Sequence, residues 1–135
     1  MNMNKDYPEL HWISLILRVA MASLFFLAAL GKFMMGLEVT SNNIVGMYKD
    51  SFLPTGLLVA YTHVLPFAEA LIPIWLLTGY KLRAGWIFTA CIFITLAFGL
   101  GVAKQNAADI YVYILATCVG IYVSRFDTCQ LGRKK

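Results

Sequence analysis

Four long runs of apolar residues, separated by short polar segments, make up most of the chain. The runs predict helices at about residues 10–32, 53–78, 84–103 and 109–124. A bilayer core about 30 Å thick needs roughly 20 apolar residues per helical crossing, so the first three runs are long enough to span it and the fourth is at the lower limit. Prolines inside the second run kink a membrane helix without ending it. The pattern predicts an all-α membrane protein, a single domain over residues 1–135 with four transmembrane helices.

The polar segments between the runs differ in length. The longest, at about residues 36–51, joins the first two predicted helices, whereas the turns at 79–83 and 104–109 are short. Apolar residues 44, 45, 47, 48 and 52 recur at near-helical spacing within the long segment. This spacing predicts a short amphipathic helix that lies at the membrane interface.

The distribution of positive charge predicts the orientation. Loops on the cytoplasmic side of a membrane carry an excess of Lys and Arg. The side that holds both termini carries seven such residues: Lys5, Lys81, Arg83, Arg125, Arg133, Lys134 and Lys135. The other side carries three: Lys32, Lys49 and Lys104. Both termini are therefore predicted to be cytoplasmic, with the long loop outside, and the tryptophans agree because Trp12, Trp75 and Trp86 all fall toward the cytoplasmic interface.

Composition supports a membrane location and excludes other classes. Hydrophobic residues make up 60% of the chain, the mean hydropathy is +0.71, and the net charge is +4. Such a chain lies outside the usage of soluble globular proteins. The positive residues are scattered at the ends of apolar runs rather than gathered with aromatic residues, so we expect contact with membrane lipids and no binding of nucleic acid.

Two ionisable residues lie inside the predicted spans. Charged groups are costly in a membrane, and each one is therefore a functional hypothesis. Arg18 is nine residues from Glu9, a rise of about 13 Å, and Glu69 is eleven residues from Tyr80, a rise of about 16 Å on the antiparallel second helix. Because these depths nearly coincide, we predict that Arg18 and Glu69 form a buried ion pair.

Two interpretations of that pair remain open. The pair fixes only the register of the two helices, or it lines a polar pocket in which a quinone or another small polar-headed ligand forms hydrogen bonds. Thr62, one heptad before Glu69, would extend the polar stripe. An opening to lipid beside Arg18 and Glu69 would favour the pocket, and a closed, packed pair would favour a structural role.

The histidines and cysteines give weaker signals. His63 is either bonded to a neighbouring backbone or hydroxyl group or carries protons in a redox or transport step. Cys91 and Cys118 fall at similar depths, which allows a redox pair or two small apolar side chains. Neither these nor Cys129 has metal-ligand spacing, so we expect no metal site.

Five segments carry a pattern that goes beyond hydropathy: residues 18–20, 24–26, 29–33, 65–72 and 77–83. Its most specific positions are Arg18, Gly31 with Lys32, and the Pro66-x-x-Glu69 motif. With these segments the chain resembles the DoxX family of four-helix membrane proteins over nearly its whole length. The resemblance implies a four-helix fold in a bacterial inner membrane and a role as one subunit or accessory protein of a redox complex. Lys32 joins Thr62 and His63 as supporting residues of the site.

Three functions follow as hypotheses. The first is the membrane subunit of a redox system that contacts quinone near Arg18 and Glu69, with a redox protein as partner. The second is a non-enzymatic membrane scaffold or assembly partner, with a homo-oligomer among its forms. The third is a binder or transporter of a lipid or small molecule. No cofactor beyond quinone is suggested by the residues, and a pocket alone does not establish a reaction.

Overall fold

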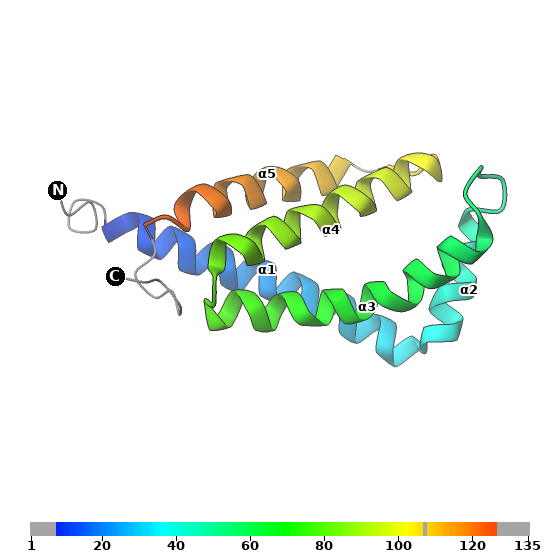
Figure 1. Ribbon diagram of the computed structural model, residues 1–135, viewed down its shortest axis with the longest axis horizontal. Coiled ribbons are helices and arrows are strands. Elements are labelled where there is room, and N and C mark those ends of the chain that lie inside the picture. The colour runs from blue at the N-terminus through cyan, green and yellow to red at the C-terminus, as the bar shows by residue number, and fades with distance from the viewer. Residues whose placement is uncertain (1–7, 107, 127–135) are drawn as a thin grey trace.

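The computed structural model describes residues 8–106 and 108–126 and folds them into five helices (Figure 1). The helices are α1 Pro8–Met35, α2 Leu37–Met47, α3 Thr55–Thr78, α4 Leu82–Val102 and α5 Ala108–Val123. No strand occurs in the described part of the chain. Four residues used above for the orientation, Lys5, Arg133, Lys134 and Lys135, lie outside the described residues, as does Cys129.

The four predicted helical ranges correspond to α1, α3, α4 and α5, with ends that differ by at most three residues. Helix α3 continues through Pro66 and Pro73 and ends at Gly79, whose φ of 69° is the left-handed conformation that commonly closes a helix. A second positive φ, 89° at Gly36, turns the chain between α1 and α2.

The four long helices run side by side, and each is antiparallel to the one before it (Figure 1). Helix α1 packs against α3 and α5, and α4 packs against the same two helices from the other side. Helix α2 packs on α3 and α1, at the end of the molecule away from the start of α1 and the end of α5 (Figure 1). Consequently the C-terminal end of α3 lies beside the first half of α1.

Helix α2 fits the predicted short helix, but its buried face is not the apolar one. Thr40 and Ser41 are its buried residues, whereas Val39 and Met47 are more than half exposed. The Ser41 hydroxyl lies 2.8 Å from that of Thr62 on α3. A polar contact with α3 therefore helps to orient α2, and part of its apolar surface faces outward.

The distribution of residues between inside and outside indicates a membrane protein. Nine polar or charged residues in the described part of the chain are buried, among them Arg18 and Glu69, while many large apolar side chains on all the long helices are exposed. Among the described helices, α1, α3 and α4 are long and apolar enough to cross a membrane, and α5 is a shorter apolar helix of 16 residues. Such exposure would be costly in water and is favourable in hydrocarbon.

The core lies where α1, α3, α4 and α5 meet. The rings of Phe25 and Phe93 lie 4.9 Å apart, and Phe93 stacks on Tyr113 at 5.5 Å, which connects α1, α4 and α5. Trp86, in the first turns of α4, is fully buried in this core, so its ring packs between helices rather than facing outward. Gly120 on α5 makes room for it, since a Cβ there would lie 2.6 Å from the indole ring.

Candidate functional site: intramembrane charges and an apolar cavity

Arg18 contacts the C-terminal end of α3. Its Nε donates to the carbonyl of Leu76 at 2.7 Å, and its Nη2 donates to the carbonyl of Leu77 at 3.0 Å. The last carbonyls of a helix have no partner within the helix and carry partial negative charge. A buried guanidinium in this position satisfies two of them and complements the negative end of the helix. Arg18 therefore joins α1 to the end of α3.

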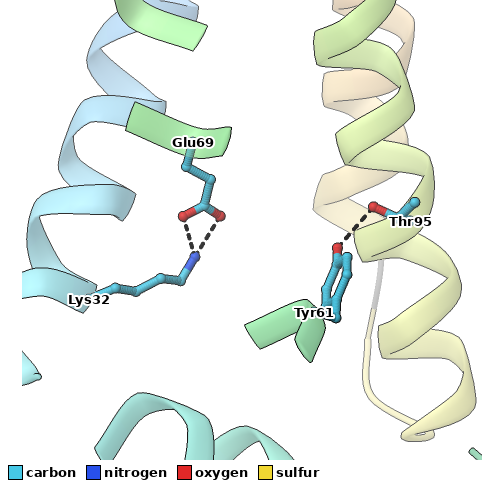
Figure 2. Close-up of polar contacts among 4 residues, drawn as sticks. All are labelled: Lys32, Tyr61, Glu69 and Thr95. Carbon is cyan, nitrogen blue, oxygen red and sulfur yellow. Dashed lines mark hydrogen bonds and ion pairs between the residues drawn. The ribbon is translucent and has the colours of Figure 1, made fainter. Parts of the chain in front are cut away.

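Lys32 and Glu69 form the ion pair between α1 and α3. The Lys32 ammonium donates to Glu69 Oε1 at 2.5 Å and also to Oε2. Figure 2 shows the two side chains pointing toward one another across the gap between their helices. The Glu69 side chain is only 3% exposed and that of Lys32 is 19% exposed. Both carboxylate oxygens are thus occupied within the protein.

The predicted pairing of Glu69 with Arg18 is therefore wrong, although both residues are buried as expected. The prediction compared the depths of Cα atoms and neglected the direction of the side chains. Helical side chains lean toward the N-terminus of their own helix. Because α1 and α3 are antiparallel, Arg18 leans toward the end of α3 while Glu69 leans the opposite way, toward Lys32. The supporting residue Lys32 is the actual partner.

Thr62 and His63 have separate contacts. Thr62 is buried on the same face of α3 as Glu69, as predicted, and its hydroxyl donates to the carbonyl of Val59 while it meets Ser41 of α2. His63 is exposed, and its Nδ1 lies 2.8 Å from the same Val59 carbonyl, to which it donates. A histidine bonded to neighbouring backbone is the simpler of the two readings given above.

A cavity of about 290 Å³ lies between α2, α3 and α4, and we call it the α2–α3–α4 cavity. Its walls are almost entirely apolar, with leucines from α3 and α4, Ile44 and Met47 from α2, and Phe98. Leu57, Thr95 and Phe98 are exposed, so the cavity reaches the outer surface of α3 and α4. Neither Arg18 nor Glu69 lines it. The cavity is thus separate from the buried charges.

Three hydroxyl groups provide the polar part of this cavity. The Tyr61 hydroxyl lies 2.9 Å from Thr95 Oγ1 across the seam between α3 and α4 (Figure 2). Thr95 donates to the Ile92 carbonyl at 2.8 Å, so Tyr61 is the donor in that pair. Tyr48, directly after α2, reaches α4 at Gly99, where a Cβ would lie 2.8 Å from its hydroxyl oxygen. Burial raises the pKa of Tyr48, which keeps this phenol protonated.

These three residues were not identified from the sequence. A hydroxyl-bearing residue inside or next to an apolar run indicates a candidate polar contact. It does not identify the partner, because Tyr61 and Thr95 are 34 positions apart in the chain. Only the packing of α3 against α4 shows that they meet.

The thiols and metal-ligating residues form no further site among the described residues. Cys91 and Cys118 are free and exposed. Within residues 8–106 and 108–126, no group of His, Cys, Asp or Glu is arranged to hold a metal ion.

Comparison with known proteins adds no relative to this description. No protein-family model matches the chain, and neither a curated protein nor a solved structure matches it.

Proposed function

We propose that the chain crosses a bacterial inner membrane four times, with α5 as the fourth span and both termini in the cytoplasm. Helix α5 is about 24 Å long, slightly short for a bilayer, and local thinning accommodates such a mismatch at modest cost. Tyr111 and Tyr122, exposed near its two ends, suit the two interfacial belts. On the side proposed to be cytoplasmic, the positive residues that the structure describes are Lys81, Arg83 and Arg125.

Labelling of single cysteines tests this topology. In a cysteine-free background, Lys49→Cys should react with a membrane-impermeant maleimide in intact spheroplasts, and Arg83→Cys should react only after the membrane is opened. The opposite pattern would refute the orientation. Equal labelling of both positions in intact spheroplasts would refute the crossing of the membrane by α3, which lies between them.

We further propose that the protein binds a lipophilic small molecule in the α2–α3–α4 cavity. The observation that carries this proposal is a largely apolar space that reaches the surface of α3 and α4 and holds a few polar groups. This combination is typical of sites for small molecules, and its volume is at the lower end of their range. In a membrane, the exposed side of the cavity would face lipid, from which such a ligand could enter.

Mass spectrometry of gently solubilised protein tests the binding. We expect a small molecule to copurify with the wild type and to be lost from Leu100→Trp, in which an indole occupies part of the cavity. Ile94→Trp is the matched control, because Ile94 is 54% exposed on the same helix and does not line the cavity. Equal recovery from all three proteins, or no bound molecule in the wild type, would refute the proposal.

The resemblance to the DoxX family makes quinone a candidate ligand and a redox protein a candidate partner. If the protein is the membrane subunit of a redox system, quinone should copurify with the wild type and be lost from Leu100→Trp. Folded Glu69→Gln protein should still contain quinone. The reverse result would return the quinone site to Glu69.

A non-enzymatic scaffold is the second candidate, and the closed Lys32–Glu69 pair favours it. Glu69 is 2% exposed, with both carboxylate oxygens on one ammonium, as expected for a contact that holds helices together. A scaffold predicts that crosslinked partner proteins are the same for wild type and Leu100→Trp. Loss of the partner together with the ligand would argue against it.

A further inference from the structure

The hydrogen-bonding capacity of the α2–α3–α4 cavity is uneven. Thr95 already donates to a backbone carbonyl and Tyr61 already donates to Thr95. The Tyr48 hydroxyl has no hydrogen bond within the described part of the chain. Among the lining side chains, the Tyr48 O–H is therefore the donor that remains available to a bound molecule.

The position of Tyr48 makes this donor part of the cavity wall. Tyr48 lines the cavity, and its hydroxyl lies against Gly99, where α4 has no side chain. Tyr48 is half-buried at the end of α2, and α2 is oriented by the hydroxyl contact between Ser41 and Thr62. The phenol is thus held between two helices rather than free to turn into solvent.

The cavity walls also restrict the charge of the ligand. Among the described residues that line the cavity, none is Asp, Glu, Lys, Arg or His. An unpaired charge in such surroundings would lose its hydration without compensation. A ligand that fits is uncharged, with an acceptor for the Tyr48 proton and an apolar body that fills the remaining space.

We propose that the α2–α3–α4 cavity binds an uncharged lipophilic molecule that carries a carbonyl group, and that the Tyr48 hydroxyl donates a hydrogen bond to this carbonyl. The inference rests on the proposed function, since it specifies the chemical class of the ligand for the same cavity. Tyr48 is the residue that distinguishes a carbonyl-bearing molecule from a hydrocarbon of equal shape, and the leucine walls bind both.

A pair of probes with the same ring system tests this specificity. Fluorenone carries a carbonyl where fluorene carries a methylene group. Protein in lipid nanodiscs is photolabelled with benzophenone, and each probe is added as competitor while adducts on residues 44–65 and 95–100 are counted by mass spectrometry. One hydrogen bond should make fluorenone, relative to fluorene, about three- to tenfold more potent in wild type than in protein that lacks the Tyr48 hydroxyl.

Substitutions assign the effect to Tyr48. The potency of fluorenone relative to fluorene should fall about three- to tenfold in Tyr48→Phe, which removes only the hydroxyl. Gly99→Ala should lower it as well, because the added methyl displaces that hydroxyl. The controls Tyr111→Phe, on the exposed face of α5, and Gly101→Ala, where a Cβ meets nothing within 4 Å, should keep the wild-type ratio. Each probe partitions into lipid to the same extent for every variant, so the change in their ratio between wild type and a variant does not depend on partitioning.

The two proposals fail in different ways. If both probes compete but Tyr48→Phe leaves their ratio unchanged, the assignment of Tyr48 is refuted while binding in the cavity stands. If neither probe reduces labelling of the cavity residues, both the binding proposal and the inference built on it are refuted.

Discussion

Removal of Lys32 tests how the two intramembrane charges depend on each other. The change Lys32→Met keeps an unbranched apolar stem of similar length and deletes the ammonium. Glu69 is 2% exposed, with both carboxylate oxygens on that ammonium. After the substitution, the Glu69 carboxyl group on α3 remains buried in the protein without its counter-charge.

The two single substitutions should differ in cost. Breaking a buried pair by removing one partner costs about 3 kcal/mol or more, and we expect this loss of unfolding free energy in Lys32→Met. Glu69→Leu should cost less, about 1 kcal/mol, because Lys32 is partly exposed near the end of α1 and its long stem can carry the ammonium toward the interface. The double variant should cost no more than about 1 kcal/mol, which corresponds to a coupling of roughly 3–4 kcal/mol.

A second cycle with Arg18 serves as the control. Arg18 binds the carbonyls of Leu76 and Leu77, and Leu76 lies about 10 Å along α3 from Glu69. The effects of Arg18→Met and Glu69→Leu should therefore add within about 0.5 kcal/mol. Unfolding by steric trapping in bicelles gives the free energies. Strong coupling in the Arg18 cycle, or none in the Lys32 cycle, would refute the pairing described here.

Two further predictions concern helix packing. Gly120→Ala should lower the unfolding free energy by about 1–3 kcal/mol in the same assay, because the new methyl would overlap the buried ring of Trp86; Gly101→Ala, with open space around it, should have little effect, and equal losses would contradict the packing explanation. Ser41→Ala should speed amide hydrogen exchange across α2, since it removes the hydroxyl contact with α3 worth about 1 kcal/mol. The control Asn43→Ala, at an exposed position of α2, should leave that exchange unchanged. Equal exchange in the two variants would show that contacts other than the Ser41 hydroxyl fix α2 on α3.

Much of the fold could be predicted from the sequence because hydropathy is a local property. The ranges 10–32, 53–78, 84–103 and 109–124 were predicted within three residues of α1, α3, α4 and α5. Residues that must remain in hydrocarbon over about 30 Å leave a continuous signal in the chain. The burial of Arg18 and Glu69 could be predicted for the same reason, since charges in apolar runs avoid lipid.

The partner of Glu69 depended on the direction in which the side chains point, which the depth of the Cα atoms alone does not give. Arg18 and Glu69 start at similar depths but lean apart, whereas Lys32 and Glu69 start further apart and lean together. The lean of helical side chains is a general rule, so antiparallel neighbours could have been assigned this way. The burial of Trp86 differs, because it required knowledge that Gly120 lies opposite.

The sequence by itself determined the class of the protein, the places where its long helices begin and end, and the charged residues that must be sheltered from lipid. Only the tertiary structure decided which of those charges pair, and it alone revealed the α2–α3–α4 cavity. The lining of that cavity comes from three helices and a connecting loop, and Tyr48 and Tyr61 meet their α4 neighbours across dozens of intervening residues. Hydropathy is set residue by residue, whereas a cavity exists only where separate helices fail to fill the space between them.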